Sequence, residues 1–317
     1  MRRSAIAGGA VWIGLAAASR MQGARLDTIE LLFLLGPLVV VPLGLGLSSQ
    51  FTGEAQIGFP IRIARKLQLP AALCAVASFW LPQGVVATIL VLPWLVLGCF
   101  VGLEGLMALL RGEFGKLKTA CRIVSFLYLP IGCAWLAASR FGLSPMSFQE
   151  PIVLLTAVHF HFAGFAAPLL ALAAGSAIEK KTAMPRHIFN VVAAGILAGP
   201  GLLAAGFVIG PRLKLAMALL VACSEVGLSL FFLAHARSMR PRLAQVLVTI
   251  SALSVLFAMV LAGVWAIGEF PLQPFVHLDE MARFHGTANA LGFILCGLVG
   301  WTLAARPTAA PQQGGIQ

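Results

Sequence analysis

The sequence predicts an all-α protein that crosses a membrane about ten times as a single helical bundle. Of its 317 residues, 60% are hydrophobic and only 10% are charged, and the mean hydropathy is +0.95. Soluble domains carry about 25% charged residues, so the composition excludes an ordinary cytosolic enzyme, a disordered chain and a nucleic-acid-binding protein. At about 20 apolar residues per crossing, the length allows about ten spans with short loops and little room for an extramembrane domain.

Ten apolar runs, separated by polar or basic segments, define the predicted spans of this transmembrane domain (1–317). Their approximate boundaries are 4–19, 28–47, 67–81, 84–110, 119–138, 151–177, 187–209, 215–235, 243–268 and 285–304. The third run is short and ends at a Leu-Pro-Gln-Gly sequence, so it could also enter the membrane and turn back. Residues 305–317 are expected to form a short cytoplasmic tail.

The distribution of Lys and Arg gives an independent test of this topology. With ten spans, 16 of the 22 basic residues fall on one side of the membrane and 6 on the other. Cytoplasmic loops of membrane proteins are enriched in Lys and Arg, which places both termini in the cytoplasm. If the third run did not cross, the basic loops at 111–122, 180–186 and 237–242 would oppose the basic loop at 62–66. The ten-span interpretation is therefore preferred.

The first run and the cysteines each need a separate interpretation. Arg2 and Arg3, a short apolar stretch and three alanines at 16–18 also resemble a secretory signal peptide, which is the alternative for residues 1–19. The six cysteines lie singly inside apolar runs. They predict neither a disulfide framework nor a cysteine metal site.

The sixth span contains the densest group of polar residues inside the predicted membrane. His159 lies eight residues past Pro151, about 12 Å along the helix, and His161 lies about 3 Å deeper. Imidazole is too short to reach the interface, so each ring needs a partner. Residues two apart point about 200° away from each other on an α-helix, so a single metal ion bound by both is a weak expectation. Pro168 removes the hydrogen bond to the carbonyl of Gly164 and predicts a distortion nearby.

A second polar group spans the last outer loop and the tenth span. His285 and Asn289 share one helix face with Gly292 and Cys296, at the spacing i, i+4, i+7 and i+11. Such a face either approaches another helix closely or lines a cavity. The loop before it adds three charged residues at the same outer surface, namely Asp279, Glu280 and Arg283. The alternative is a solvated loop with a capping histidine.

Carboxylates inside the predicted spans are the remaining candidates. Glu225 lies about 16 Å past Lys214, near the middle of a hydrocarbon core of about 30 Å. A carboxyl group there is expected to be protonated or paired across helices, and it could carry a proton or bond a neighbouring helix. Glu104 and Arg122 lie near the cytoplasmic ends of spans four and five, and a structural ion pair between them is expected.

The two histidine-containing segments resemble signatures of a known family. Residues 159–165 read HFHFAGF and residues 283–293 read RFHGTANALGF. They resemble the HFH(F/Y)xGF and HGxxNAxGF signatures of the YndJ-like family of bacterial membrane proteins, and the acidic pair before Met281 resembles that family's lead-in to the second motif. The resemblance implies a polytopic bacterial membrane protein of a family often labelled as transporters. It points to the same histidines without supplying a reaction.

Taken together, these observations predict a transporter or permease in a bacterial cytoplasmic (inner) membrane, coupled to protons. The expected outward-facing site comprises His159, His161, His285 and Asn289, with Glu225 below it as the proton-coupling group. The charged residues Asp279, Glu280 and Arg283 are further candidates for binding the substrate or protons. The expected partners are the lipid bilayer and a small-molecule or lipid-like substrate, and nucleic acid is excluded. No cofactor is predicted. One alternative is a membrane enzyme that acts on a lipid or isoprenoid. Such an enzyme would bind a metal ion or haem through His159, His161 and His285, or would use histidines as acid and base. The other alternative is a structural protein whose polar residues only join helices.

Overall fold

The computed structural model describes residues 1–21, 26–52, 57–178, 186–271 and 275–305. All regular elements in these ranges are helical, which confirms the all-α prediction. Three of the long helices change type along their length and are named here by their first and last parts. The helices in chain order are α1 (Arg2–Ala18); the α2–α3 rod with α2 (Thr28–Leu35), η1 (Gly36–Val40) and α3 (Val41–Thr52); α4 (Phe59–Ser78); α5 (Val85–Leu110); η3 (Glu113–Gly115); α6 (Leu117–Phe141); η4 (Pro145–Ser147); the α7–α8 rod with α7 (Ile152–His159), η5 (Phe160–Ala166) and α8 (Ala167–Ile178); α9 (Arg186–Ile209); α10 (Pro211–Ala236); α11 (Arg242–Glu269); and the α12–α13 rod with α12 (Leu278–Glu280), η6 (Met281–Gly286), η7 (Ala288–Leu295) and α13 (Cys296–Ala304).

Each of the ten predicted spans overlaps one of the long helices. Within the described ranges, eight helices are long and apolar enough to cross a membrane, and α1 and α4 are not among these eight. The first has 17 residues, and the second carries Arg62, Arg65 and Lys66 in its first half. Crossing by these two helices therefore remains a prediction.

The start of α4 lies eight residues before the predicted start of the third span. Hydropathy alone ends the run at its basic residues, but the helix continues through them because it is amphipathic there. Arg62 and Lys66 are exposed, whereas Ile61, Ala64 and Gln68 are buried against the bundle. Gln68 donates a hydrogen bond of 2.8 Å to the carbonyl of Pro37.

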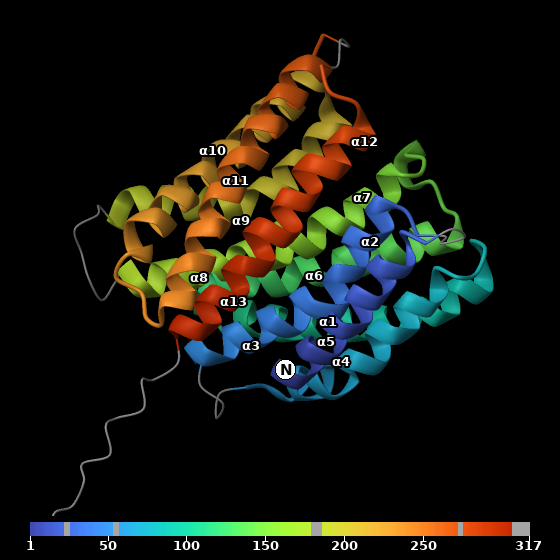
Figure 1. The fold of residues 1–317 in the computed structure, drawn as a ribbon, viewed down its shortest axis with the longest axis horizontal. Helices are drawn as coiled ribbons and strands as arrows, with labels where there is room; N and C mark the ends of the chain where they lie inside the picture. The colour runs from blue at the N-terminus through green and yellow to red at the C-terminus, as the bar shows by residue number, and fades with distance from the viewer. Residues whose placement is uncertain (22–25, 53–56, 179–185, 272–274, 306–317) are drawn as a thin grey trace, which may run out of the picture.

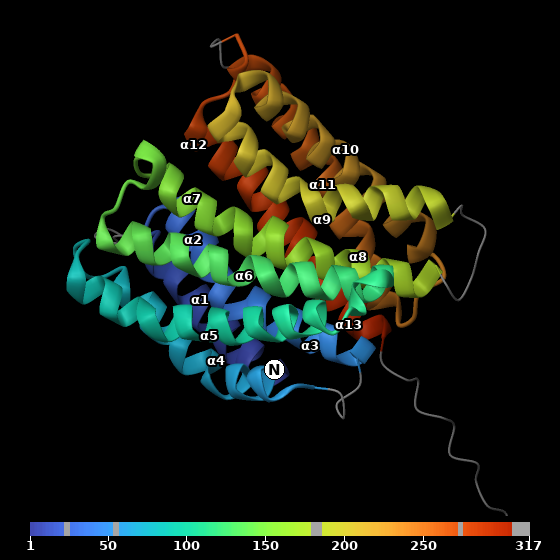
Figure 2. The ribbon, with the colours of Figure 1, turned by 180° about the vertical axis from the view of Figure 1, so that it is seen from behind.

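The long helices form two groups that diverge from each other, and parts of the α2–α3 and α7–α8 rods lie between them (Figures 1 and 2). Helices α9, α10 and α11 run side by side in one direction, and α4, α5 and α6 run in another. The α2–α3 and α7–α8 rods form the centre, because 83% and 67% of their apolar stretches are buried. The corresponding fraction is only 28% for α9 and 33% for α11, so these helices present most of their surface outward.

Within the described part of the chain, four π-helical segments interrupt the α-helices, and these four lie in the three rods named above. The η5 segment directly precedes Ala167 and Pro168, where the sequence predicts a distortion. A π-helix bonds i to i+5 and is rare, mostly as single turns and frequently at functional sites. Both histidine motifs therefore fold into backbone that ordinary α-helical spacing does not describe.

Small residues allow the long helices to approach closely. A Cβ atom at Gly98 of α5 would lie 2.6 Å from the sulfur of Cys133 on α6, and one at Gly102 would lie 2.8 Å from the Pro130 ring. Interfaces of this kind are typical of helices that associate within a membrane. On the other side of the centre, Trp12 of α1 donates a hydrogen bond of 2.8 Å to the carbonyl of Leu31, which holds α1 against the α2–α3 rod.

Candidate functional site

His161 is fully buried at the centre of the bundle and has a partner on each ring nitrogen. Its Nδ1 lies 2.8 Å from the carbonyl of Ala157, and its Nε2 lies 3.1 Å from the indole Nε1 of Trp94 on α5. Because a carbonyl only accepts and an indole N–H only donates, the ring is neutral with its proton on Nδ1. The ring also packs edge-on against Phe33 at 5.2 Å between centroids. His161 therefore joins η5 to α5 and to the α2–α3 rod.

His285 has the same pattern of bonds at a different place in the fold. Its Nδ1 lies 2.9 Å from the carbonyl of Ala258 on α11, and its Nε2 lies 3.1 Å from the side-chain amide of Asn289. The amide nitrogen of Asn289 donates to the imidazole, which again places the ring proton on Nδ1. The predicted pairing of these two residues on one face is present, although the backbone between them is π-helical for most of its length.

His159 differs from the other two histidines at one atom. Its Nδ1 donates to the carbonyl of Leu155 at 2.7 Å, but its Nε2 makes no hydrogen bond to any described residue. The side chain is exposed, even though many protein atoms surround it. The η5 segment begins at the residue after His159 and contacts the η7 segment, which carries Asn289. The two motifs are therefore neighbours in the fold, and His159 has one imidazole nitrogen without a hydrogen bond to the described residues.

His159 and His161 point in opposite directions, as expected for residues two apart on a helix. His161 points into the core and His159 points to an accessible surface. A single metal ion bound by both would require one ring to leave its position. Ligation by His161 or His285 through Nε2 would also displace Trp94 or Asn289. In the part of the chain that the structure describes, no three potential metal-ligating side chains gather at one point.

The charged residues before His285 lie at the start of the α12–α13 rod. Glu280 accepts a hydrogen bond of 2.9 Å from the backbone N–H of His277 and forms a capping box with it. Asp279 is exposed, and the guanidinium of Arg283 lies 5.5 Å from the ring centroid of Phe284. Among the described contacts, none joins these charged groups to His159 or His285. Capping is thus the role that the geometry supports for Glu280.

Glu225 is buried in the middle of α10 and stands apart from the histidines. Only 4% of it is exposed, and its Oε2 has no hydrogen-bond partner among the described residues. No ion pair to this carboxyl group is present among the described residues. The structure therefore leaves Glu225 as an isolated buried carboxyl group rather than as a direct neighbour of the two motifs.

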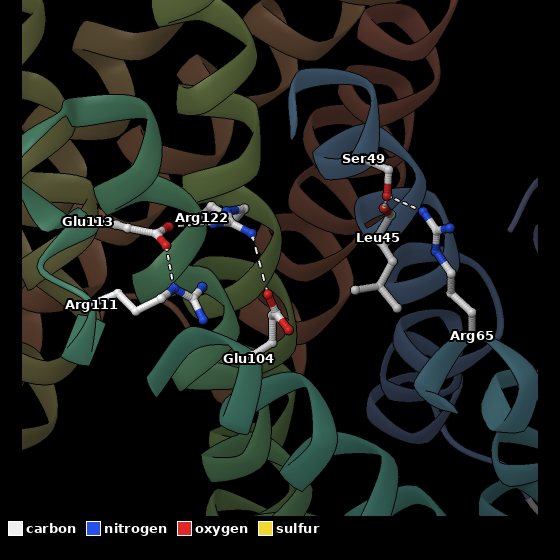
Figure 3. A network of polar contacts seen from close by, with 7 residues as sticks. All are labelled: Leu45, Ser49, Arg65, Glu104, Arg111, Glu113 and Arg122. Carbon is white, nitrogen blue, oxygen red and sulfur yellow. Dashed lines mark hydrogen bonds and ion pairs between the residues drawn. The ribbon is translucent and has the colours of Figure 1, made fainter. Parts of the chain in front are cut away.

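A second polar cluster lies at the predicted cytoplasmic ends of α5 and α6 (Figure 3). Arg122 and Glu104 form the ion pair expected from the sequence, with 3.9 Å between Nη1 and Oε1. Arg122 also binds Glu113 at 3.1 Å, and Glu113 binds Arg111 at 2.6 Å. Arg65 of α4 donates to the hydroxyl of Ser49. A Cβ at Gly58 would overlap the Glu104 carboxylate, so glycine is required at this close approach.

Sequence reasoning missed Trp94 and Arg140. Trp94 lies in a continuous apolar run, where a tryptophan carries no signal of a specific hydrogen bond. Arg140 lies two residues past the predicted end of the fifth span, but it is 7% exposed and donates to the carbonyls of Ser78 and Leu81 at 3.2 and 2.8 Å. Its guanidinium also lies 4.8 Å from the ring centroid of Phe79, so it holds the turn after α4.

The fold and the two motifs define a multi-pass α-helical membrane protein. The family model for YndJ-like proteins matches residues 31–293, and the chain belongs to this family. The chain is 26% identical over 307 residues to the "Uncharacterized membrane protein YndJ" of Bacillus subtilis (strain 168). The aligned region covers 96% of this chain and 53% of that relative. It thus spans about half the length of the curated relative. No solved structure matches the chain.

Proposed function

We propose that this protein is a proton-linked transporter whose substrate site forms around His159, His285 and Asn289. The observation that carries the proposal is that both family motifs contain π-helical segments and that the η5 and η7 segments contact each other. Such segments are frequent at functional sites because they leave the regular backbone bonding pattern. Polar side chains inside a membrane protein are functional candidates by default.

The open Nε2 of His159 gives this site its chemistry. It can accept a hydrogen bond or a proton, whereas the Nε2 atoms of His161 and His285 already accept bonds. Imidazole titrates near neutral pH when its surroundings allow it, which suits a group that exchanges protons during transport. The amide of Asn289 adds a donor and an acceptor for a small polar substrate.

His161 and Glu225 have different roles in this proposal. His161 positions the η5 segment, because its two hydrogen bonds fix the turn that carries His159. Glu225 is the candidate for a separate proton-carrying step. An isolated buried carboxyl group is much less costly in its protonated, neutral form than as a charged carboxylate, so it binds a proton readily. The distribution of Lys and Arg supports a site near the outer side of a bacterial inner membrane.

Solute-driven proton movement in proteoliposomes tests this proposal. The purified protein is reconstituted with an internal pH dye, and a panel of amino acids, sugars, nucleosides, organic acids and amines is added. A solute that moves protons with the wild type is expected to fail with His159→Ala and with Glu225→Gln. The matched control is His187→Ala, an exposed histidine at the start of α9. Proton movement that is equal in all variants would contradict the assigned roles.

The alternative function is that of a membrane enzyme that uses a metal ion or haem, and a simpler measurement tests it. An absorption spectrum and elemental analysis of the detergent-purified protein are compared with those of the His159→Ala, His161→Ala double variant. A Soret band, or about one metal per chain that disappears in the variant, would replace the transporter proposal. A colourless, folded and metal-free wild type would favour the transporter.

A further inference from the structure

A groove separates the first halves of α6 and α9 on the outside of the bundle. Its volume is about 490 Å³. It is lined mainly by apolar side chains, including Leu117 and Val124 from α6 and Ala194 and Leu197 from α9, with Asn190 as the polar exception. Since α9 is one of the least buried helices, the groove faces the surroundings of the protein rather than its core.

Tyr128 marks the deep end of the groove. Its hydroxyl donates to the carbonyl of Leu197 at 2.9 Å and accepts from the N–H of Gly201 at 3.1 Å. Tyr128 lies one helical turn beyond Val124, so this bridge joins α6 and α9 where the lining ends. From residue 190 to residue 198 the lining extends about 12 Å along α9, less than half of a hydrocarbon core of about 30 Å. The groove therefore fits within one leaflet.

The mouth of the groove carries a basic residue on each wall. Lys116 lies one turn before Ala120 on α6, and Arg186 lies one turn before Asn190 on α9, so both continue the groove-lining faces. Both side chains are exposed. The acidic group nearest in sequence to Lys116, Glu113, is already bound by two arginines. The distribution of basic residues predicts that this mouth lies at the cytoplasmic surface.

We infer that this groove binds an anionic phospholipid from the cytoplasmic leaflet. One acyl chain fills the apolar part as far as Tyr128, and the phosphate lies between Lys116 and Arg186. Asn190 lies one turn below the phosphate, at the depth of the ester carbonyls, and can donate to them. Basic pockets between membrane helices at the cytoplasmic side are suited to such headgroups. This inference does not depend on the transporter proposal.

Lipid retention by the full chain tests the inference. The purified protein is equilibrated with vesicles of phosphatidylcholine, alone or with phosphatidylglycerol, and lipids bound per chain are counted by native mass spectrometry. The charge variant is Lys116→Gln with Arg186→Gln, and its matched control is Lys66→Gln with Arg237→Gln, which removes two exposed basic residues elsewhere. The groove variant is Ala194→Phe, and its control is Val260→Phe at an exposed position of α11.

The wild type is expected to retain phosphatidylglycerol in preference to phosphatidylcholine. The charge variant is expected to bind phosphatidylglycerol about thirtyfold more weakly, as follows from the usual contribution of two basic residues near an anionic surface. The groove variant is expected to lose both lipids, and both controls to behave as the wild type. Elution of every variant as a single folded species on size exclusion separates binding from folding. Equal retention of the two lipids by the wild type, or unchanged retention by the charge and groove variants, would overturn the inference.

Discussion

The indole Nε1 of Trp94 and the Nε2 of His161 lie 3.1 Å apart and join α5 to η5 inside the bundle. Both side chains are fully buried. Since His161 also donates to the carbonyl of Ala157, both of its ring nitrogens are bonded while the ring is neutral. This bond anchors the π-helical segment η5 at His161, which points inward, whereas His159, the last residue of α7, points outward.

Trp94→Phe is expected to lower the free energy of unfolding by about 1–3 kcal/mol, because the buried Nε2 of His161 loses its donor. The measurement is reversible unfolding of the purified protein by titration with SDS in mixed micelles. Trp80→Phe, at a side chain that is 45% exposed, is the control and is expected to change little. Equal effects of the two substitutions would show that the hydrogen bond does not stabilise the fold.

Gly132→Ala is expected to destabilise the bundle, because its Cβ would lie 2.7 Å from the Nδ1 of His161 and 3.0 Å from the Cβ of Phe160. Overpacking of this kind costs about 1–3 kcal/mol. Gly263→Ala is the matched control, since nothing lies within 4 Å of its Cβ on α11. Alanine favours a helix by up to about 1 kcal/mol over glycine, so the control is expected to be neutral or stabilising. Thermal unfolding in detergent measures both, and a destabilised control with an unaffected Gly132→Ala would contradict the packing argument.

Arg122→Gln is expected to cost about 3–5 kcal/mol, because it leaves the buried carboxylate of Glu104 without its cation. Arg111→Gln breaks the neighbouring pair with Glu113, whose two side chains are 48% and 32% exposed, and is expected to cost less than about 1 kcal/mol. Chemical unfolding of the two variants side by side measures the difference. A similar loss in both would show that burial does not set the strength of this network.

Cysteines introduced one at a time at Lys66, Arg237 and Arg283 test the topology, in a chain whose six natural cysteines are replaced by serine. All three positions are exposed. With ten spans, a membrane-impermeant maleimide applied to intact cells is expected to label only Arg283→Cys, and inside-out vesicles are expected to reverse the pattern for all three. If α4 does not cross, the cysteines at positions 66 and 237 will be labelled from opposite sides.

The helical segments and one ion pair followed from local chemistry. A backbone in lipid must satisfy its own hydrogen bonds, so long apolar runs form helices whatever their neighbours are. Glu104 and Arg122 lie at the ends of consecutive runs joined by a short loop, and their pairing followed from that placement. The start of α4 could not be predicted by hydropathy, because it depends on which side of the helix faces the bundle.

Composition, apolar runs and the distribution of Lys and Arg determined by themselves that this is an all-α, multi-pass membrane protein, and the motifs indicated which histidines matter. Only the tertiary structure decided what each histidine does, because its π-helical segments depend on contacts between distant helices. Trp94 is 67 residues away from His161, and Ala258 is 27 residues away from His285. Hydrogen bonds over such separations form only after the bundle has packed. In the packed bundle the Nε2 atoms of His161 and His285 are bonded, whereas the Nε2 of His159 has no hydrogen bond to a described residue.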